Sequence, residues 1–176
     1  MSLRFSLKLP DKWPAPDFEL VDTQGNLKKL ADFQDKQGLL IVFTCNHCPY
    51  AIAAWPLLIE LHKEFGDKVN FVAINSNDSV NYPADSFDKM KELALPFPYL
   101  YDETQEVARA YQAQCTPDLY LFKDSKLYYH GRINDNWEYP GKVTQEELKQ
   151  ALESLISGNE ISANQKPSQG CSIKWK

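Results

Sequence analysis

The chain has 176 residues, a length that can bury a hydrophobic core and favours one domain over residues 1–176. Its 43% hydrophobic, 24% charged and 12% aromatic residues are typical of a globular protein and argue against disorder. Acidic residues outnumber Lys and Arg by 24 to 19, giving a net charge of −5, which argues against binding to nucleic acid or to an anionic membrane surface.

The first 37 residues are interpreted as an N-terminal extension. A β-hairpin is predicted within it. Apolar and polar residues alternate at 18–22, residues 23–26 are typical of a turn, and a second strand follows at 27–30. Residues 1–10 lack the apolar stretch of a signal peptide, and no later stretch approaches the roughly 18 apolar residues of a membrane span. We therefore expect a soluble, cytoplasmic protein.

An unbroken apolar run at residues 38–44 predicts a central strand that is covered on both faces. A C-x-x-C motif follows at residues 45–48. Pro49 suits the first turn of a helix over residues 49–65. The backbone N–H at this position has no partner within a helix, so its absence in proline costs nothing. Residues 69–75 predict the next strand, so the motif lies in a βαβ unit.

The rest of the chain predicts helices and short strands, which are, in order, a helix at 84–95, a strand at 99–101, a helix at 104–114 capped by Thr104, antiparallel strands at 119–122 and 127–133, and a helix from Thr144 to Ile156. This order predicts an α/β fold with a mixed parallel and antiparallel central sheet, helices on both faces and the N-terminal hairpin as an extension. Residues 38–157 form the predicted core. Residues 158–176 form an aperiodic tail, which we expect to be a surface strap or flexible.

The strongest chemical signal is the pair Cys45 and Cys48, at the junction of a strand and a helix. Unpaired N–H groups and the helix dipole stabilise a thiolate at such a position and lower a cysteine pKa from about 8.5 to between about 3.5 and 7.5. We therefore expect Cys45 to attack a disulfide and Cys48 to resolve the mixed disulfide. His47 lies between them, where a protonated imidazole would stabilise the thiolate further.

The order of strand, C-x-x-C, helix and strand, followed by Thr116-Pro117 before another strand, resembles the thioredoxin-like superfamily. Residues 15–20, Ala-Pro-Asp-Phe-Glu-Leu, resemble its redoxin branch, the alkyl-hydroperoxide-reductase/TSA and TlpA-like proteins. The resemblance covers residues 14–157 and implies a thioredoxin-like fold and a thiol–disulfide oxidoreductase. It also implies a cis bond at Thr116-Pro117 beside the C-x-x-C motif, with the backbone before Pro117 pairing with a bound substrate chain.

Three positions depart from thioredoxins. Thr44 stands where thioredoxins carry Trp, and residues 38–43 contain no carboxylate where thioredoxins bury an Asp. Pro56, which should kink the helix, falls about one turn later. His47, directly before the second cysteine, resembles the DsbA oxidants. The direction of the reaction, reduction or oxidation, therefore stays open.

Two further cysteines are isolated in the sequence. Cys115 precedes Pro117 by two residues, so it is either a third redox partner near the motif or a packing residue, and packing is favoured because buried cysteines are usually inert. Together with Thr116 and Pro117 it is a candidate for substrate contact. Cys171 lies in the tail, where a mobile thiol either resolves a disulfide or is incidental. We favour the incidental interpretation.

Two other functions remain as alternatives. A thiol peroxidase is consistent with the N-terminal resemblance, but the Pro-x-x-x-Thr/Ser-x-x-Cys pattern of peroxiredoxins is missing around Thr44. A copper metallochaperone of the Sco type has this fold, and Cys45, Cys48 and His47 are soft ligands that suit Cu(I) or Zn. Sco-like proteins, however, space their cysteines more widely and use a distant His.

The leading interpretation implies particular partners. We expect a protein or small-molecule disulfide substrate and a thiol reductant or reductase, with no cofactor and no metal, and no nucleic acid or membrane partner. A cytoplasmic setting would keep the cysteine pair mostly reduced and would favour a reductase or a peroxide-linked, antioxidant role.

Overall fold

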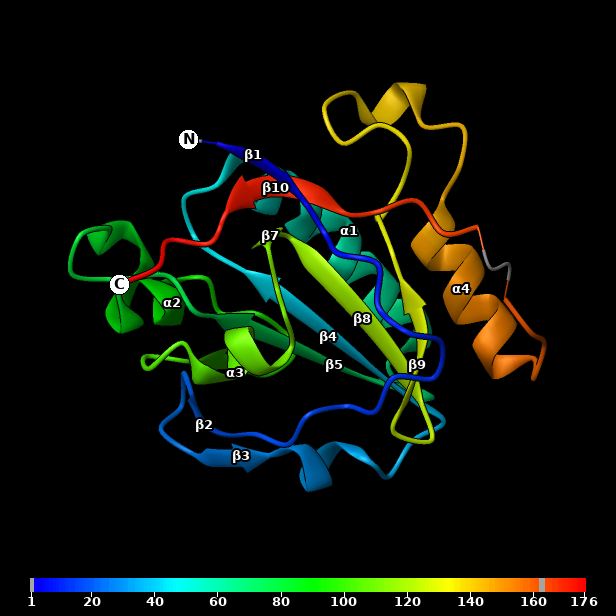
Figure 1. The fold of residues 1–176 in the computed structure, drawn as a ribbon, viewed down its shortest axis with the longest axis horizontal. Coiled ribbons are helices and arrows are strands. Elements are labelled where there is room, and N and C mark those ends of the chain that lie inside the picture. Colours follow the sequence, from blue (N-terminus) through cyan, green and yellow to red (C-terminus); the bar gives the residue numbers. More distant parts are fainter. Residues whose placement is uncertain (1, 162–163) are drawn as a thin grey trace.

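The computed structural model describes residues 2–161 and 164–176. Its main sheet has seven strands in the order β3-β2-β6-β5-β4-β8-β9 (Figure 1). Their bounds are β2 Glu19–Asp22, β3 Leu27–Lys29, β4 Gly38–Thr44, β5 Val69–Asn75, β6 Tyr99–Tyr101, β8 Asp118–Lys123 and β9 Lys126–His130. Strands β4, β5 and β6 are parallel and the other pairs are antiparallel, which confirms the mixed sheet.

Helices cover both faces of this sheet. Their bounds are α1 Pro49–Phe65, α2 Phe87–Glu92, α3 Glu106–Ala110 and α4 Glu147–Ile156, with 3-10 turns at Leu30–Phe33, Pro83–Asp85 and Pro140–Lys142. Helices α1 and α4 pack on one face, and α3 packs on the other together with the N-terminal segment (Figure 1). Among the described residues, no helix is both long enough and apolar enough to cross a bilayer.

Strand β4 positions the C-x-x-C motif, and its burial explains its place at the centre of the sheet. All seven of its residues are buried. Leu40 and Val42 face α1 and α4, whereas Ile41 and Phe43 face α3. Complete burial of such a side chain contributes about 1.5–3 kcal/mol, so this strand anchors both layers of the core.

A second sheet contains the part of the chain that was expected to be an aperiodic tail. Its three strands, in the order β1-β10-β7, are β1 Leu3–Phe5, β10 Gln169–Ser172 and β7 Cys115–Thr116. The expectation of an unstructured C-terminus is therefore wrong over β10. No local hydrophobic period revealed this strand, because it is held by backbone pairing with β1 on one side and β7 on the other (Figure 1).

Two predicted helices are shorter than their sequence pattern indicated. Helix α2 begins only after Ser86, whose hydroxyl accepts a hydrogen bond from the N–H of Lys89, and Ala94 follows its end at φ 44°. Helix α3 begins after Gln105 rather than at Thr104. Its cap is the buried carboxylate of Asp102, because carboxylate oxygens satisfy the unpaired N–H groups of a first helical turn.

The last helix also starts later than Thr144, which was predicted to cap it. It begins at Glu147, and the hydroxyl of Thr144 donates instead to Asp135. This hydrogen bond joins residues nine positions apart in the sequence, so a local helix pattern does not predict it. The other predicted elements, the hairpin, β4, α1, β5, β6 and the β8–β9 pair, are confirmed, with the ends of several shifted by a few residues.

The Asp102 cap leads to a stability prediction. Its oxygens accept from the N–H groups of Val107 at 3.4 Å and Ala108 at 2.9 Å and from the Ser76 hydroxyl at 2.7 Å. In Asp102→Asn, a side-chain NH₂ must face one of these donors, so we expect a loss of about 1–3 kcal/mol in the free energy of unfolding. Urea denaturation measures it. The exposed control Asp88→Asn should change stability by less than about 0.5 kcal/mol, and an equal loss in both variants would contradict the cap.

Candidate active site

The two motif cysteines lie where β4 ends and α1 begins. Cys48 is the N-cap residue of α1, and Pro49 occupies the first helical position as predicted. Both cysteines are fully buried, at 0% exposure. With Ala51 and Cys171 they form a small cluster of their own. The motif is therefore at a helix N-terminus, as expected, but closed to solvent.

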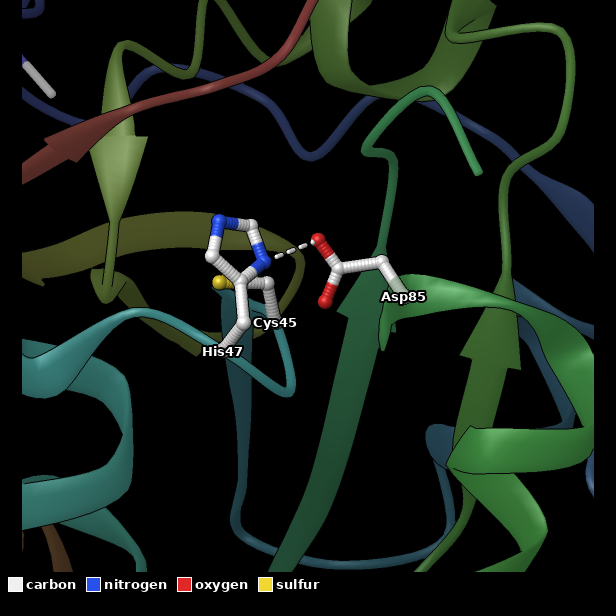
Figure 2. Close-up of side chains that lie close together, drawn as sticks. All are labelled: Cys45, His47 and Asp85. Carbon is white, nitrogen blue, oxygen red and sulfur yellow. Dashed lines mark hydrogen bonds and ion pairs between the residues drawn. The ribbon is translucent and has the colours of Figure 1, made fainter. Parts of the chain in front are cut away.

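A buried carboxylate holds the loop between the cysteines in place (Figure 2). Asp85 is fully buried and accepts hydrogen bonds from the Asn46 N–H at 2.7 Å and from Asn77 Nδ2 at 2.7 Å. Its Oδ2 lies 2.7 Å from Nδ1 of His47. Because a carboxylate only accepts, Nδ1 carries the proton and Nε2 is left as the acceptor of the neutral ring.

His47 is thereby oriented beside Cys45. One atom each of Cys45, His47 and Asp85, a sulfur, a ring nitrogen and a carboxylate oxygen, lie within 4.8 Å of one another (Figure 2). A parallel ring contact with Tyr82, with centroids 5.7 Å apart, fixes the plane of the imidazole. A thiol, a base and an orienting acid in this order form the arrangement that activates a nucleophile.

The Thr116-Pro117 bond is cis, as the resemblance implied, and it lies beside both cysteines. Cys45 Sγ is 3.4 Å from the Thr116 hydroxyl oxygen. Cys48 Sγ lies 3.3 Å from the Thr116 carbonyl oxygen. Thr116 thus contacts both members of the pair, which confirms its predicted proximity to the motif.

The edge of β7 that was expected to receive a substrate chain is already paired. Residue Cys171 of β10 lies opposite Thr116, and Ser172 lies opposite Cys115. The chain's own C-terminal segment therefore takes the backbone position assigned to a substrate. Any substrate chain that pairs there must first displace β10.

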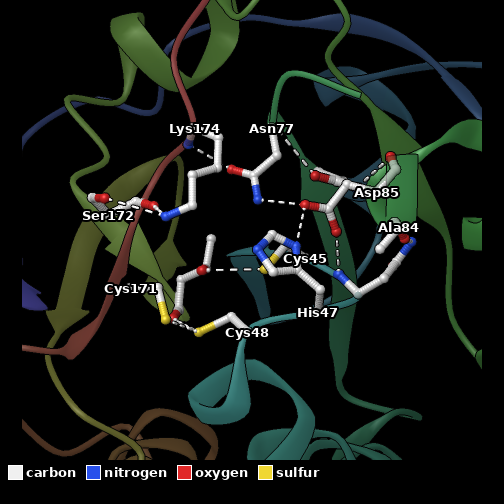
Figure 3. A network of polar contacts seen from close by, with 12 residues as sticks. Cys45, His47, Cys48, Asn77, Ala84, Asp85, Cys171, Ser172 and Lys174 are labelled. Carbon is white, nitrogen blue, oxygen red and sulfur yellow. Dashed lines mark hydrogen bonds and ion pairs between the residues drawn. The ribbon is translucent and has the colours of Figure 1, made fainter. Parts of the chain in front are cut away.

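Cys171 does not lie in a mobile tail, which corrects the expectation from the sequence about its place. Its residue is buried, at 3% exposure, and its Sγ lies 2.7 Å from Cys48 Sγ (Figure 3). No local pattern predicts this contact, because 123 residues separate the two cysteines. The pairing of β10 with β7 brings them together.

Cys115 behaves as a packing residue. It is fully buried, and its thiol donates to the Pro117 carbonyl at 3.5 Å. Burial raises the pKa of this thiol far above its usual range, which keeps it neutral and unreactive. Packing was the favoured interpretation of Cys115.

The charge of the sulfur cluster is centred on Cys48. The pKa of Cys48 is lowered because thiols of Cys45 and Cys171 and the Ala51 N–H all donate to its sulfur. The pKa of Cys45 is raised by that hydrogen bond, by burial and by the charge of Asp85. Within this pair the charge falls on Cys48, the N-cap residue of α1, rather than on Cys45, where the sequence pattern predicts it.

Asp85 and Asn77 are the functional residues that the sequence did not reveal. The sequence pattern places Asp85 inside the helix predicted over residues 84–95. A usable signal was nevertheless present. Strands β4 and β5 are parallel neighbours, so the loops after them leave the same edge of the sheet and bring their polar residues together.

A cavity of about 360 Å³ lies beside the closed cysteines. It is bounded by Tyr50 next to Cys48 and by Pro117 next to Thr116, and further lining comes from Leu57, Ile133 and Trp137. The aromatic rings of Tyr50 and Trp137 pack together with centroids 3.9 Å apart. This apolar hollow reaches the edge of the sulfur cluster from the side of α1.

The chain is similar to known proteins over most of its length. The model of the AhpC/TSA family matches residues 12–130. The thiol-disulfide oxidoreductase ResA of Geobacillus thermodenitrificans is 29% identical over 143 residues, which cover 80% of this chain and 75% of that protein.

Solved structures give the same picture of the fold. An uncharacterized conserved protein from Geobacillus kaustophilus is 45% identical, with a TM-score of 0.94 over 100% of this chain and 97% of that one. The thioredoxin domain of a thiol-disulfide oxidoreductase from Bacteroides vulgatus is 20% identical, with a TM-score of 0.59 over 70% of this chain and 89% of that one, and it shows the fold alone.

The fold and its relatives define a thioredoxin-like thiol–disulfide oxidoreductase. More particularly, the chain belongs to the AhpC/TSA family, whose model matches well over half of its length. The redoxin resemblance found in the sequence is thereby confirmed.

The lowered pKa of Cys48 leads to a prediction of pH dependence. Because its folded pKa is lowered toward about 4, the ultraviolet absorbance of one thiolate should persist in the reduced protein as the pH falls below neutrality. A titration from alkaline to acidic pH measures it. Cys48→Ser should remove the acidic step, while Cys115→Ala should retain it. Appearance of all thiolate absorbance only near the ordinary cysteine pKa of about 8.5 would contradict the assignment.

Proposed function

We propose that the protein exchanges thiols and disulfides through the pair Cys45 and Cys48, with protein disulfides as substrates. The observation that carries the proposal is the position of this pair at the N-terminus of α1, in contact with Thr116 on one side and within reach of His47 on the other. The oxidoreductase names among the relatives support the same chemistry.

Cys45 is the attacking thiol in this proposal. A ring nitrogen of His47, oriented by Asp85, lies within 4.8 Å of its sulfur, a separation that one water molecule or a small shift of the ring bridges. The Cys45 proton passes to His47 as the sulfur attacks the substrate disulfide. One substrate sulfur bonds to Cys45, and the other leaves as a thiolate that takes up a proton.

Cys48 resolves the mixed disulfide. Once Cys45 is bonded to the substrate, its thiol no longer donates to Cys48, but the Cys171 thiol and the Ala51 N–H still donate to the Cys48 sulfur and favour its thiolate. The thiolate attacks Cys45 Sγ, the Cys45–Cys48 disulfide forms, and the second substrate sulfur leaves reduced. The substrate gains two electrons and the pair loses two, so a thiol reductant or reductase must then restore the pair.

We also propose that the protein works in the cytoplasm and in the reducing direction. The support for the direction is the reducing thiol pool of that compartment, which keeps the cysteine pair mostly reduced. Substrates first bind at the cavity beside Tyr50 and Pro117, and β10 then separates from β7 to give them access to the buried cysteines.

Trapping of mixed disulfides tests the roles of the two cysteines. Cys48→Ser should accumulate a covalent adduct at Cys45 when a disulfide-bonded peptide is added, because no resolving thiolate remains. Cys45→Ser should form no adduct with the peptide and should lose turnover. Mass spectrometry of the trapped protein identifies the sulfur. The opposite result, an adduct on Cys48 in the first-cysteine variant and none on Cys45 in the other, would show that Cys48 attacks and Cys45 resolves.

The His47–Asp85 pair leads to a separate kinetic prediction. His47→Gln keeps a polar side chain but removes the base, so turnover of the peptide disulfide at neutral pH should fall by about 10²-fold. The loss should shrink when free imidazole is added, because an external base then takes the Cys45 proton. Rescue by imidazole distinguishes this from a structural effect. His130→Gln, at a second histidine that pairs with a buried aspartate, Asp118, is the matched control. No rescue at any imidazole concentration would argue against the base.

A further inference from the structure

Strand β10 is fitted closely onto the cis-proline loop. Gly170 lies against Thr116, and a Cβ at this position would be 2.1 Å from the Thr116 carbonyl oxygen. Only glycine permits this approach, because an atom at that distance must displace the backbone it meets. The neighbouring residue, Cys171, is thereby held in register with Thr116.

The tail is tied down beyond this contact. The backbone N–H of Lys174 donates to Asn77 Oδ1 at 2.8 Å, and the Lys174 carbonyl accepts from Gln105 Nε2 at 2.8 Å (Figure 3). Before β10, the Ser168 hydroxyl donates to the Gly131 carbonyl at 2.7 Å. These bonds fix the chain on both sides of Cys171, so its thiol is presented to the motif at a fixed position.

Three sulfurs therefore meet around Thr116, with Cys48 in the middle. Cys48 Sγ is 2.7 Å from Cys171 Sγ, and Cys45 reaches Cys48 from the other end of the C-x-x-C loop. A disulfide bond is about 2.05 Å long, so the Cys48 and Cys171 sulfurs need to approach by less than about 1 Å to bond.

We propose that Cys171 is a third redox residue, which takes over the disulfide from Cys45 and stores it as Cys48–Cys171. The proposal rests on the proposed function, because that reaction delivers the first disulfide. It assigns to the C-terminal strand a part in each turnover.

The transfer is a thiol–disulfide exchange within one chain. The Cys171 thiolate attacks Cys48 Sγ, the bond between Cys48 and Cys171 forms, and the bond between Cys45 and Cys48 breaks. Cys45 leaves as a thiolate, and the proton lost by Cys171 ends on Cys45. One disulfide is present before and after, so no external oxidant or reductant takes part.

Lys174 and Thr116 assist the two halves of the exchange. Burial raises the pKa of the Cys171 thiol, and the positive charge of the Lys174 ammonium group, which donates to the Ser172 carbonyl at 2.9 Å, opposes that rise (Figure 3). The Thr116 hydroxyl, 3.4 Å from Cys45 Sγ, donates to the leaving sulfur. Fixing both reactants on one scaffold gives the exchange the high effective concentration of an intramolecular reaction.

Disulfide mapping of the full chain tests the proposal. Wild-type protein is equilibrated in graded glutathione buffers, its thiols are trapped with acid and an alkylating agent, and its peptides are read without reduction by mass spectrometry. We expect a Cys48–Cys171 disulfide in the wild type, in equilibrium with Cys45–Cys48. If no Cys48–Cys171 disulfide is found in any of the glutathione buffers, the proposal is overturned.

Two glycine variants test whether the fit of β10 is responsible. Gly170→Ala removes no sulfur but pushes β10 off Thr116, so formation of Cys48–Cys171 should slow by about 10²-fold, the cost of about 1 Å of misplacement. Gly141→Ala is the matched control, because a Cβ there meets nothing within 4 Å. Equal rates in the two variants would contradict the role of β10.

Cys171→Ser separates this proposal from the proposed function. If Cys45–Cys48 forms in Cys171→Ser and in the wild type but Cys48–Cys171 never appears in the wild type, the third redox residue fails and the proposed function stands. If Cys171→Ser forms no Cys45–Cys48 disulfide at any poise, the proposed function fails with it. The fourth cysteine supplies a further control, since Cys115→Ala should leave the pattern of disulfides unchanged.

Discussion

The buried carboxylate of Asp85 is the constraint on which the arrangement of the site depends. A carboxylate withdrawn from water is tolerated only where hydrogen bonds replace its hydration. Asp85 obtains them from the Asn46 N–H, from His47 and from Asn77. Two of these donors belong to the C-x-x-C loop. The loop must therefore close over Asp85, and this closure turns His47 toward Cys45.

The same carboxylate extends its influence to the C-terminus. Asn77 donates to Asp85 with its amide nitrogen and accepts from the Lys174 N–H with its amide oxygen. One side chain thus joins the anion beneath the motif to the segment that carries Cys171. The position of the third sulfur and the orientation of His47 depend on one connected hydrogen-bond network, so a disturbance at either end is felt at both.

The parts of the fold that were predictable are those with a local signal. The apolar run of β4, the hydrophobic period of α1 and the proline at its start locate the motif correctly, because each depends on neighbours in sequence. Strand β10 and Asp85 had no such signal. Cys171 reaches Cys48 through backbone pairing between segments more than 50 residues apart, and Asp85 reaches the motif because two parallel strands end together.

A closed site of this kind must open for a substrate, and the structure shows where. Cys45 and Cys48 have no exposed surface, and β10 is the element that covers them at Thr116. Strand β7 has only two residues, so its pairing with β10 supplies few hydrogen bonds, each worth about 0.5–1.5 kcal/mol net. Ser168 and Lys174 hold the chain on either side. Separation of β10 from β7 between these two anchors therefore costs far less than release of the whole tail, and it returns Cys171 to the same place when the strand closes.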